Sequence, residues 1–271
     1  MFRGQVALQA RWRLALFPLG LAAIGLALLA LPTLARAAGY VAMGDSYSSG
    51  VGTREYYSDS GDCKRSPHAY PVKVAPRIGS PLTFVACSGA RTQDVVDDQL
   101  GPLSGSTTEA TVSSGGNDAG FASVITSCAR PWPWTCWGDI DNAQTYIRNT
   151  LPGMLDSVYA SIRSRAPSAI VGVVGYPRIF NEVDQCNFVS RISPGEQQRL
   201  NETADLLRDV TRARAQAHGF AFVDAIPSFV GHAVCDPAEW INGLSNPISE
   251  SYHPNRAGQD QYANLVTPAI D

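Results

Sequence analysis

The stretch that decides the fold is YVAMGDSYSSG, residues 40–50. An apolar run over 40–43 is followed by glycine, aspartate and serine, which is typical of a strand that ends in a loop. Ligands of open α/β sheets bind at the carboxyl ends of strands, so Ser46 occupies a position suited to a nucleophile. An ordinary strand-to-loop turn fits the same residues, because a serine hydroxyl reacts only when a base and charge-stabilising donors lie nearby.

Outward from this stretch, short apolar runs alternate with longer segments of helical periodicity. This alternation predicts an α/β fold in which a parallel sheet has helices on both faces. Five strands are predicted, over residues 40–43, 82–86, 110–113, 170–174 and 221–223. Three long helices are predicted, over residues 144–165, from Pro194 to residue 216, and over 257–265. Ser193 and Glu196 form a capping-box pattern that marks the start of the second helix.

The first 37 residues have the pattern of a secretory signal peptide. Arg3, Arg11 and Arg13 precede a long apolar run, and the segment closes on Ala35-Arg36-Ala37, which suits signal peptidase. We expect cleavage after Ala37 and secretion to the extracellular space. An uncleaved membrane anchor is the alternative, because the apolar run approaches the roughly 20 residues that span a bilayer.

Residues 38–271 are long enough for one domain with a sizeable core. The whole chain has a net charge of −3. The leader contains four arginines and no acidic residue, so the remainder carries −7. No Lys/Arg cluster is present that would bind phosphate backbones, and we therefore expect no nucleic-acid partner.

All six cysteines lie after the leader, which in a secreted protein predicts three disulfides. Several connectivities are open. Pairing of sequential neighbours is the simplest, because each bridge then closes a loop beside one predicted unit. The residues concerned are Cys63, Cys87, Cys128, Cys136, Cys186 and Cys235. A metal site is disfavoured, because the chain has neither a Cys-x-x-Cys nor a His-Glu-x-x-His pattern.

Three further short motifs follow the predicted elements. Gly89 follows the second strand and is able to turn a backbone N–H toward Ser46. Asn117, in Gly-Gly-Asn-Asp after the third strand, has a side-chain amide that is able to donate to an oxyanion. His253 precedes the last helix, and it is the best candidate for a base among the four histidines. Each motif alone also fits a turn or a structural residue.

Together, Ser46, Gly89, Asn117 and His253 make the chain resemble the SGNH hydrolases of the GDS(L) lipase and esterase family, especially their secreted actinobacterial branch. The resemblance extends from residue 40 to the C-terminus. It implies a three-layer α/β/α flavodoxin-like fold with a five-stranded parallel sheet, hydrolysis of carboxylic esters, and three disulfides paired in sequential order. Apart from the resemblance, we expect one domain over 38–271 and neither a cofactor nor a metal. We expect a monomer.

The resemblance also implies the role of each site residue. Ser46 is the nucleophile and His253 the base, with the backbone N–H groups of Ser46 and Gly89 and the Asn117 amide as the oxyanion hole. One departure concerns the group that orients His253. The family's usual aspartate three residues before the histidine is Glu250 here, and in some relatives a main-chain carbonyl takes its place. We favour the Ser251 carbonyl over Glu250.

The substrate is less well defined by the sequence. Trp132, Trp134 and Trp137 lie in a short loop between cysteines and beside them, so we expect contact with a lipid surface or an acyl chain. A rigid loop packed on the domain is an equal alternative. Besides a lipase or esterase acting on acyl lipids, a carbohydrate acetylesterase and a non-catalytic secreted binding module remain as alternatives.

Overall fold

The computed structural model describes residue 1 and residues 39–130, 133–183 and 192–271. Residues 36–271 form one compact unit. The predicted leader, apart from Met1, lies outside the described residues, so its cleavage stays a prediction. Within the described ranges, no helix is both long enough and apolar enough to cross a membrane.

A five-stranded parallel sheet forms the centre of this unit, with strand order β2-β1-β3-β4-β5. This confirms the predicted fold class. The strands are β1 (Gly39–Gly44), β2 (Leu82–Phe84), β3 (Thr107–Ser113), β4 (Ile170–Val174) and β5 (Ala221–Val223).

Two predicted strand boundaries were wrong. β2 ends at Phe84, because the N–H groups of Val85 and Ala86 both donate to the Ala42 carbonyl and so leave the regular ladder. β3 begins at Thr107, three residues before its predicted start at residue 110, because Thr107 pairs with Gly39 across an irregularity in the register.

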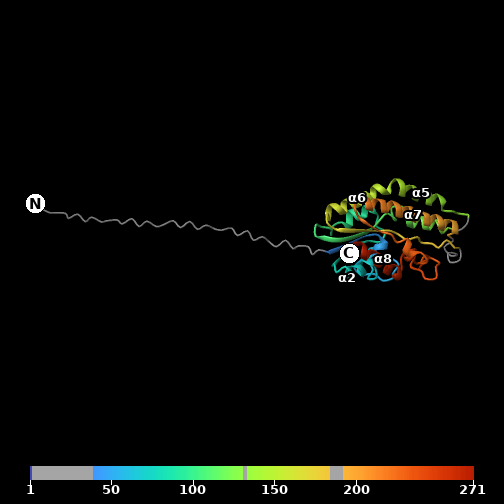
Figure 1. Ribbon diagram of the computed structural model, residues 1–271, viewed down its shortest axis with the longest axis horizontal. Helices are drawn as coiled ribbons and strands as arrows, with labels where there is room; N and C mark the ends of the chain where they lie inside the picture. Colours follow the sequence, from blue (N-terminus) through green and yellow to red (C-terminus); the bar gives the residue numbers. More distant parts are fainter. Residues whose placement is uncertain (2–38, 131–132, 184–191) are drawn as a thin grey trace. The chain divides into compact units, whose positions relative to one another are not determined.

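Helices cover both faces of the sheet. Figure 1 shows α5 (Trp137–Asn149), α6 (Leu151–Arg165) and α7 (Pro194–Ala217) on one face, and α2 (Tyr70–Arg77) and α8 (Arg256–Ile270) on the other. Successive β1 side chains point to opposite faces. Accordingly, Tyr40 and Ala42 pack in the core with α2 and α8, whereas Val41 and Met43 pack in the core with α6.

Shorter helical segments follow the strand ends and connect the larger elements. They are α1 (Ser46–Ser49), α3 (Thr92–Asp94), α4 (Phe121–Cys128), η1 (Gly61–Cys63), η2 (Val95–Gln99), η3 (Pro227–Phe229) and η4 (Ile248–Glu250).

The prediction of one helix over residues 144–165 was wrong. Two helices, α5 and α6, meet at Thr150, and α5 begins seven residues earlier, at Trp137. Pro152 accounts for the break, because proline has no N–H to donate to the preceding turn and its ring clashes with that turn's carbonyl. Proline is favoured instead in the first turn of a helix, where it lies in α6.

The capping box predicted at Ser193 is present. The Ser193 hydroxyl accepts from the Glu196 N–H, and the Glu196 carboxylate accepts from the Ser193 N–H at 3.0 Å. The last helix continues past its predicted end at residue 265 to Ile270. Buried Val266 and Ile270 pack in the core beside the sheet, and this burial holds the final turns despite Pro268.

Two of the three predicted disulfides are present, Cys63–Cys87 and Cys128–Cys136. None of the described cysteines is free. Cys186 lies outside the described residues, so its pairing with Cys235 stays a prediction.

Candidate active site

Ser46 lies at the carboxyl end of β1, as the first residue of α1. Asp45 caps this helix, because its carboxylate accepts from the Tyr47 N–H at 3.0 Å. Gly44 has a φ of 127°, and a Cβ at this position would lie 2.6 Å from the Ser113 hydroxyl on β3. The glycine therefore lets the chain leave the sheet closely enough to place Ser46 at its edge.

His253 contacts Ser46 directly. The main-chain carbonyl of Ser251 only accepts hydrogen bonds, so the Nδ1 of His253, 2.8 Å away, carries a proton and donates it. Nε2 is then the unprotonated nitrogen of the neutral ring. It accepts from the Ser46 hydroxyl at 2.8 Å, which is the geometry of a base beside a nucleophile.

Glu250 has a different partner. Its carboxylate accepts a hydrogen bond from the Tyr56 hydroxyl and is buried. The Nδ1 position of His253 is thus occupied by the Ser251 carbonyl, although the charge of Glu250 is close enough to act on the pKa of the ring.

Burial lowers the pKa of His253 to about 4. The Ser251 carbonyl and the Glu250 charge oppose this shift, while the charge of Lys64 acts in the same direction as burial. His253 is therefore neutral at pH 7 and able to accept a proton from Ser46.

Two candidate oxyanion donors come from loops beside Ser46. Gly89 adopts the left-handed φ of 82°, and apart from its two chain neighbours no residue has an atom within 4 Å of the point where a Cβ would be. The Asn117 amide donates one N–H to the Ala90 carbonyl at 2.9 Å, which ties the two loops together. An amide has two N–H groups, so the second one remains for a ligand.

A buried hydrogen-bond network lies behind the nucleophile. The Asp45 carboxylate accepts from the Ser113 hydroxyl at 2.7 Å and from the Tyr176 hydroxyl at 2.5 Å. Burial raises the pKa of Asp45 to about 6, and the hydrogen bonds from Tyr176, Ser113 and Tyr47 oppose that shift. The Gly116 N–H donates weakly to the same Tyr176 oxygen, at 3.4 Å, which links the Ser46 and Asn117 loops.

Tyr176 was not among the residues predicted from the sequence. Its position was the available signal. Tyr176 comes two residues after the end of β4, and the carboxyl ends of parallel strands meet at one edge of the sheet.

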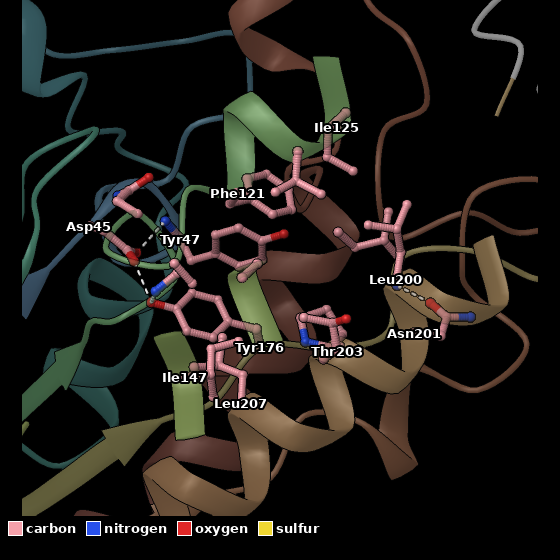
Figure 2. Close-up of a pocket in the computed structure, with 18 of the residues that line it drawn as sticks. Asp45, Tyr47, Phe121, Ile125, Ile147, Tyr176, Leu200, Asn201, Thr203 and Leu207 are labelled. Carbon is pink, nitrogen blue, oxygen red and sulfur yellow. Dashed lines mark hydrogen bonds between the residues drawn. The ribbon is translucent and has the colours of Figure 1, made fainter. Parts of the chain in front are cut away.

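An apolar pocket opens beside Ser46, and we call it the acyl pocket. It holds about 760 Å³ of unfilled space, including its opening. Figure 2 shows Tyr47 and Tyr176 near Asp45, with apolar side chains of α4, α5 and α7 around the rest. The lining comes from residues within 45–47, 116–125, 143–147, 176–179 and 200–207, and includes Phe121, Val124, Ile125, Ala143, Ile147, Ile179, Leu200, Ala204 and Leu207.

Two polar side chains that α7 contributes to this lining have internal partners. The Asn201 amide bonds to the backbone of Ile179 and Phe180. The Thr203 hydroxyl donates to the Arg199 carbonyl at 2.8 Å and accepts from Gln144. Because these groups are satisfied within the protein, the pocket presents an apolar surface to a ligand.

The predicted tryptophan cluster is only partly described. Trp134 is 65 % exposed, beside the Cys128–Cys136 disulfide. Trp137 begins α5, and its ring lies against Gly195 at the start of α7. Trp132 lies outside the described residues.

Among the residues that the structure describes, no group of three or more His, Cys, Asp or Glu side chains is placed to hold a metal ion.

Comparison with known families gives one model match over most of the chain. The model described as the GDSL-like Lipase/Acylhydrolase family matches residues 42–261. Lipase 1 of Streptomyces coelicolor is 47% identical over 227 residues, which cover 83% of this chain and 84% of that protein. The Streptomyces rimosus lipase is 44% identical over the same shares of both chains.

Solved structures agree in fold. The crystal structure of the extracellular lipase from Streptomyces rimosus matches with a TM-score of 0.81 at 44% identity, over 86% of this chain and 100% of that one. Phospholipase A1 from Streptomyces albidoflavus NA297 matches with a TM-score of 0.80, also at 44% identity, over 86% of this chain and 98% of that one.

Proposed function

Because this chain belongs to the GDSL-like lipase/acylhydrolase family and is a carboxylic ester hydrolase, we propose that it cleaves acyl lipid esters by acyl transfer to Ser46. The observation that carries this assignment is the 2.8 Å hydrogen bond between the Ser46 hydroxyl and the Nε2 of His253. It joins a nucleophile to a base that is neutral at pH 7.

In the first step, Ser46 Oγ attacks the ester carbonyl carbon while its proton passes to the Nε2 of His253. The Ser251 carbonyl accepts the hydrogen bond from Nδ1–H and stabilises the charged ring. Ser46 and His253 therefore act as a pair, without a carboxylate as third member. The tetrahedral intermediate then breaks its bond to the alcohol oxygen, which takes the proton from His253. Water, activated by the same ring, hydrolyses the acyl-enzyme and frees Ser46.

The oxyanion that forms on the carbonyl oxygen needs donors at the reaction centre. We assign this role to the backbone N–H groups of Ser46 and Gly89 and to the second N–H of the Asn117 amide. The tie between Asn117 and Ala90 supports the assignment, because it holds two of the three donors in one unit before the substrate binds.

The acyl pocket supports medium or long acyl chains. Each methylene that leaves water for an apolar surface contributes about 0.8 kcal/mol. A short acetyl group would leave most of this pocket unused, so an acetylated polysaccharide is a poorer match than a lipid.

Secretion and lipid contact complete the proposal. The leader over 1–37 and the similarity to a lipase described as extracellular support secretion. The exposure of the Trp134 indole supports contact with a lipid surface, whereas the ring of Trp137 packs in part against α7.

The test is ester cleavage by purified residues 38–271, with acyl esters from two to eighteen carbons and Ser46→Ala in parallel. We expect a preference for medium or long chains, and loss of turnover in the variant. A preference for acetyl, checked with acetylated xylan, would favour a carbohydrate esterase. If both proteins are inactive and the wild type does not react with a serine-directed organophosphate, the binding-module alternative holds.

A further inference from the structure

The acyl part and the alcohol part of a bound ester extend from Ser46 in different directions. The acyl chain enters the acyl pocket, none of whose lining comes from residues 52–66 or 244–251. The alcohol oxygen has to take its proton from the Nε2 of His253, so the alcohol part lies on the His253 side. That side is formed by the loops that hold His253 and by the segment after α1.

Lys64 lies between two of the loops that supply site residues. It follows Cys63, which is joined by a disulfide to Cys87 and whose carbonyl accepts from the Ser88 N–H at 3.0 Å, one residue before Gly89. The Lys64 Nζ donates to the Ser249 hydroxyl at 2.9 Å, on the loop that leads to His253. The charge of Lys64 therefore lies at the edge of the reaction centre, in agreement with its effect on the pKa of His253.

Arg54 contacts the same loop. Its guanidinium donates to the Asn246 carbonyl at 3.4 Å and to the Ser245 hydroxyl at 3.5 Å. We call Arg54 and Lys64 the cationic rim.

The charges of the cationic rim lack an acidic partner in the part of the chain that the structure describes. Within the described ranges, neither side chain forms an ion pair, although seven other Lys and Arg side chains do. Asp59 and Asp62 are exposed in the same segment but pair with neither cation. Both rim cations are thus held only by neutral oxygens, which leaves their charge available to an anion.

The backbone at both positions is costly for these residue types. Arg54 has a φ of 65° and Lys64 a φ of 49°, in the left-handed region that glycine and asparagine adopt more readily. Non-glycine residues in this region cluster at ligand clamps, where the surroundings hold them in place.

Apolar side chains accompany the charges. Leu244 is 48 % exposed and Ile248 is 76 % exposed, and both lie on the loop that Arg54 and Lys64 contact. An exposed apolar pair beside unpaired cations suits an amphiphile with a negative headgroup.

We propose that the cationic rim binds the phosphate of a glycerophospholipid, on the alcohol side of the ester that Ser46 cleaves. This inference rests on the proposed function and names its substrate class. Arg54 and Lys64 orient the headgroup while the acyl chain fills the acyl pocket, so that the carbonyl carbon lies at Ser46.

The experiment uses two substrates with the same acyl chains, dihexanoyl phosphatidylglycerol and dihexanoylglycerol, both as monomers below their micelle concentrations. In Lys64→Gln and Arg54→Gln, we expect kcat/KM on the phospholipid to fall about tenfold each, because a charge-assisted hydrogen bond is lost. On dihexanoylglycerol it should change less than about twofold. Glutamine keeps a donor for the Ser249 or Ser245 hydroxyl, so the loop keeps its contact.

Two control variants sharpen the test. Lys64→Arg keeps the charge and should retain most of the phospholipid activity. Lys73→Gln removes a surface lysine that pairs with Asp260 and should change neither substrate. Thermal unfolding of every variant shows whether it is folded, and Lys64→Met is the substitute if Lys64→Gln unfolds.

Equal losses on both substrates, or no loss on the phospholipid, would overturn the proposal. A loss that occurs only with anionic vesicles, and not with monomers, would assign the cations to surface adsorption and overturn it too. Failure of the proposed function gives a different result, because the wild type would then not cleave dihexanoylglycerol faster than Ser46→Ala.

Discussion

The acyl pocket opens beside Ser46, and the cationic rim contacts the loop that leads to His253, but the chain builds the two by different means. The pocket is lined mainly by helices α4, α5 and α7, and two polar side chains of α7 in this lining are satisfied within the protein. The rim consists of loop residues with left-handed backbone, and among the described residues neither of its charges forms an ion pair. One side is an apolar surface made by packing, and the other is a polar surface made by long-range hydrogen bonds.

This difference matches the two ends of a lipid ester. An apolar chain gains free energy in proportion to buried area, which a helix-lined cavity supplies without strict geometry. A charged headgroup needs donors at defined positions. Changes on one side should therefore alter the chain preference, and changes on the other the headgroup preference, while changes at the reaction centre alter both.

Asn117→Ala gives the largest expected effect among the variants that leave the Ser46 and His253 pair intact. We expect turnover to fall about 10²- to 10³-fold on every substrate, because one oxyanion donor is lost. Rates on dihexanoylglycerol and dihexanoyl phosphatidylglycerol measure it, with Asn264→Ala on the surface of α8 as the control. Unchanged turnover would remove Asn117 from the site, and a loss confined to one substrate would break the division into two sides.

Ala143→Phe should act on the acyl side alone. Ala143 is a buried residue of α5 in the pocket lining, and a phenyl ring there displaces several methylenes of a bound chain. At about 0.8 kcal/mol per methylene, we expect the ratio of twelve-carbon to two-carbon ester cleavage to fall about 10- to 100-fold. Ala160→Phe, on an exposed position of α6, is the control. An unchanged ratio would place the acyl chain elsewhere.

The pH profile tests the reaction centre that both sides share. His253 acts as a base only when it is neutral, and its pKa is lowered to about 4. We expect kcat/KM to stay level down to about pH 5 and to fall about tenfold per pH unit below pH 4. In Lys64→Gln, the acid limb should move to higher pH, because a nearby positive charge is lost. Activity regained on return to pH 7 separates titration from unfolding, and a limb near pH 6.5 would contradict the shift.

Glu250→Gln gives the smallest expected effect. Glutamine still accepts from the Tyr56 hydroxyl, and the Nδ1 of His253 keeps its bond to the Ser251 carbonyl. We expect turnover within about tenfold of the wild type on both substrates. A loss of several orders of magnitude would make Glu250 the third catalytic group and refute the Ser46 and His253 pair acting alone.

Local patterns in the sequence were enough to predict most of the strands and helices. All five strands were predicted near their observed positions, because apolar runs that enter glycine or proline turns are short-range signals. The start of α7 after its N-cap Ser193 was also predicted, since a capping box involves only neighbouring residues. The break at Thr150 was missed, although Pro152 signalled it, because helical periodicity continues across it.

The candidate residues Ser46, Gly89 and Asn117 were recognisable from strand ends, and His253 by elimination among four histidines. Their proximity could be expected from the sequence, because the carboxyl ends of parallel strands meet at one edge of the sheet. The distance of 2.8 Å between Ser46 and His253, and the choice of Ser251 over Glu250 as the partner of Nδ1, required the tertiary structure.

By itself, therefore, the sequence determined the fold class, the approximate positions of the five strands, and the candidate residues Ser46, Gly89, Asn117 and His253. The tertiary structure alone decided which helix faces enclose the acyl pocket and which loops meet at the cationic rim. The physical reason is the range of the interactions. Caps, turns and periodicity involve residues a few positions apart, whereas Lys64 and Ser249 are 185 positions apart and meet only in the folded chain.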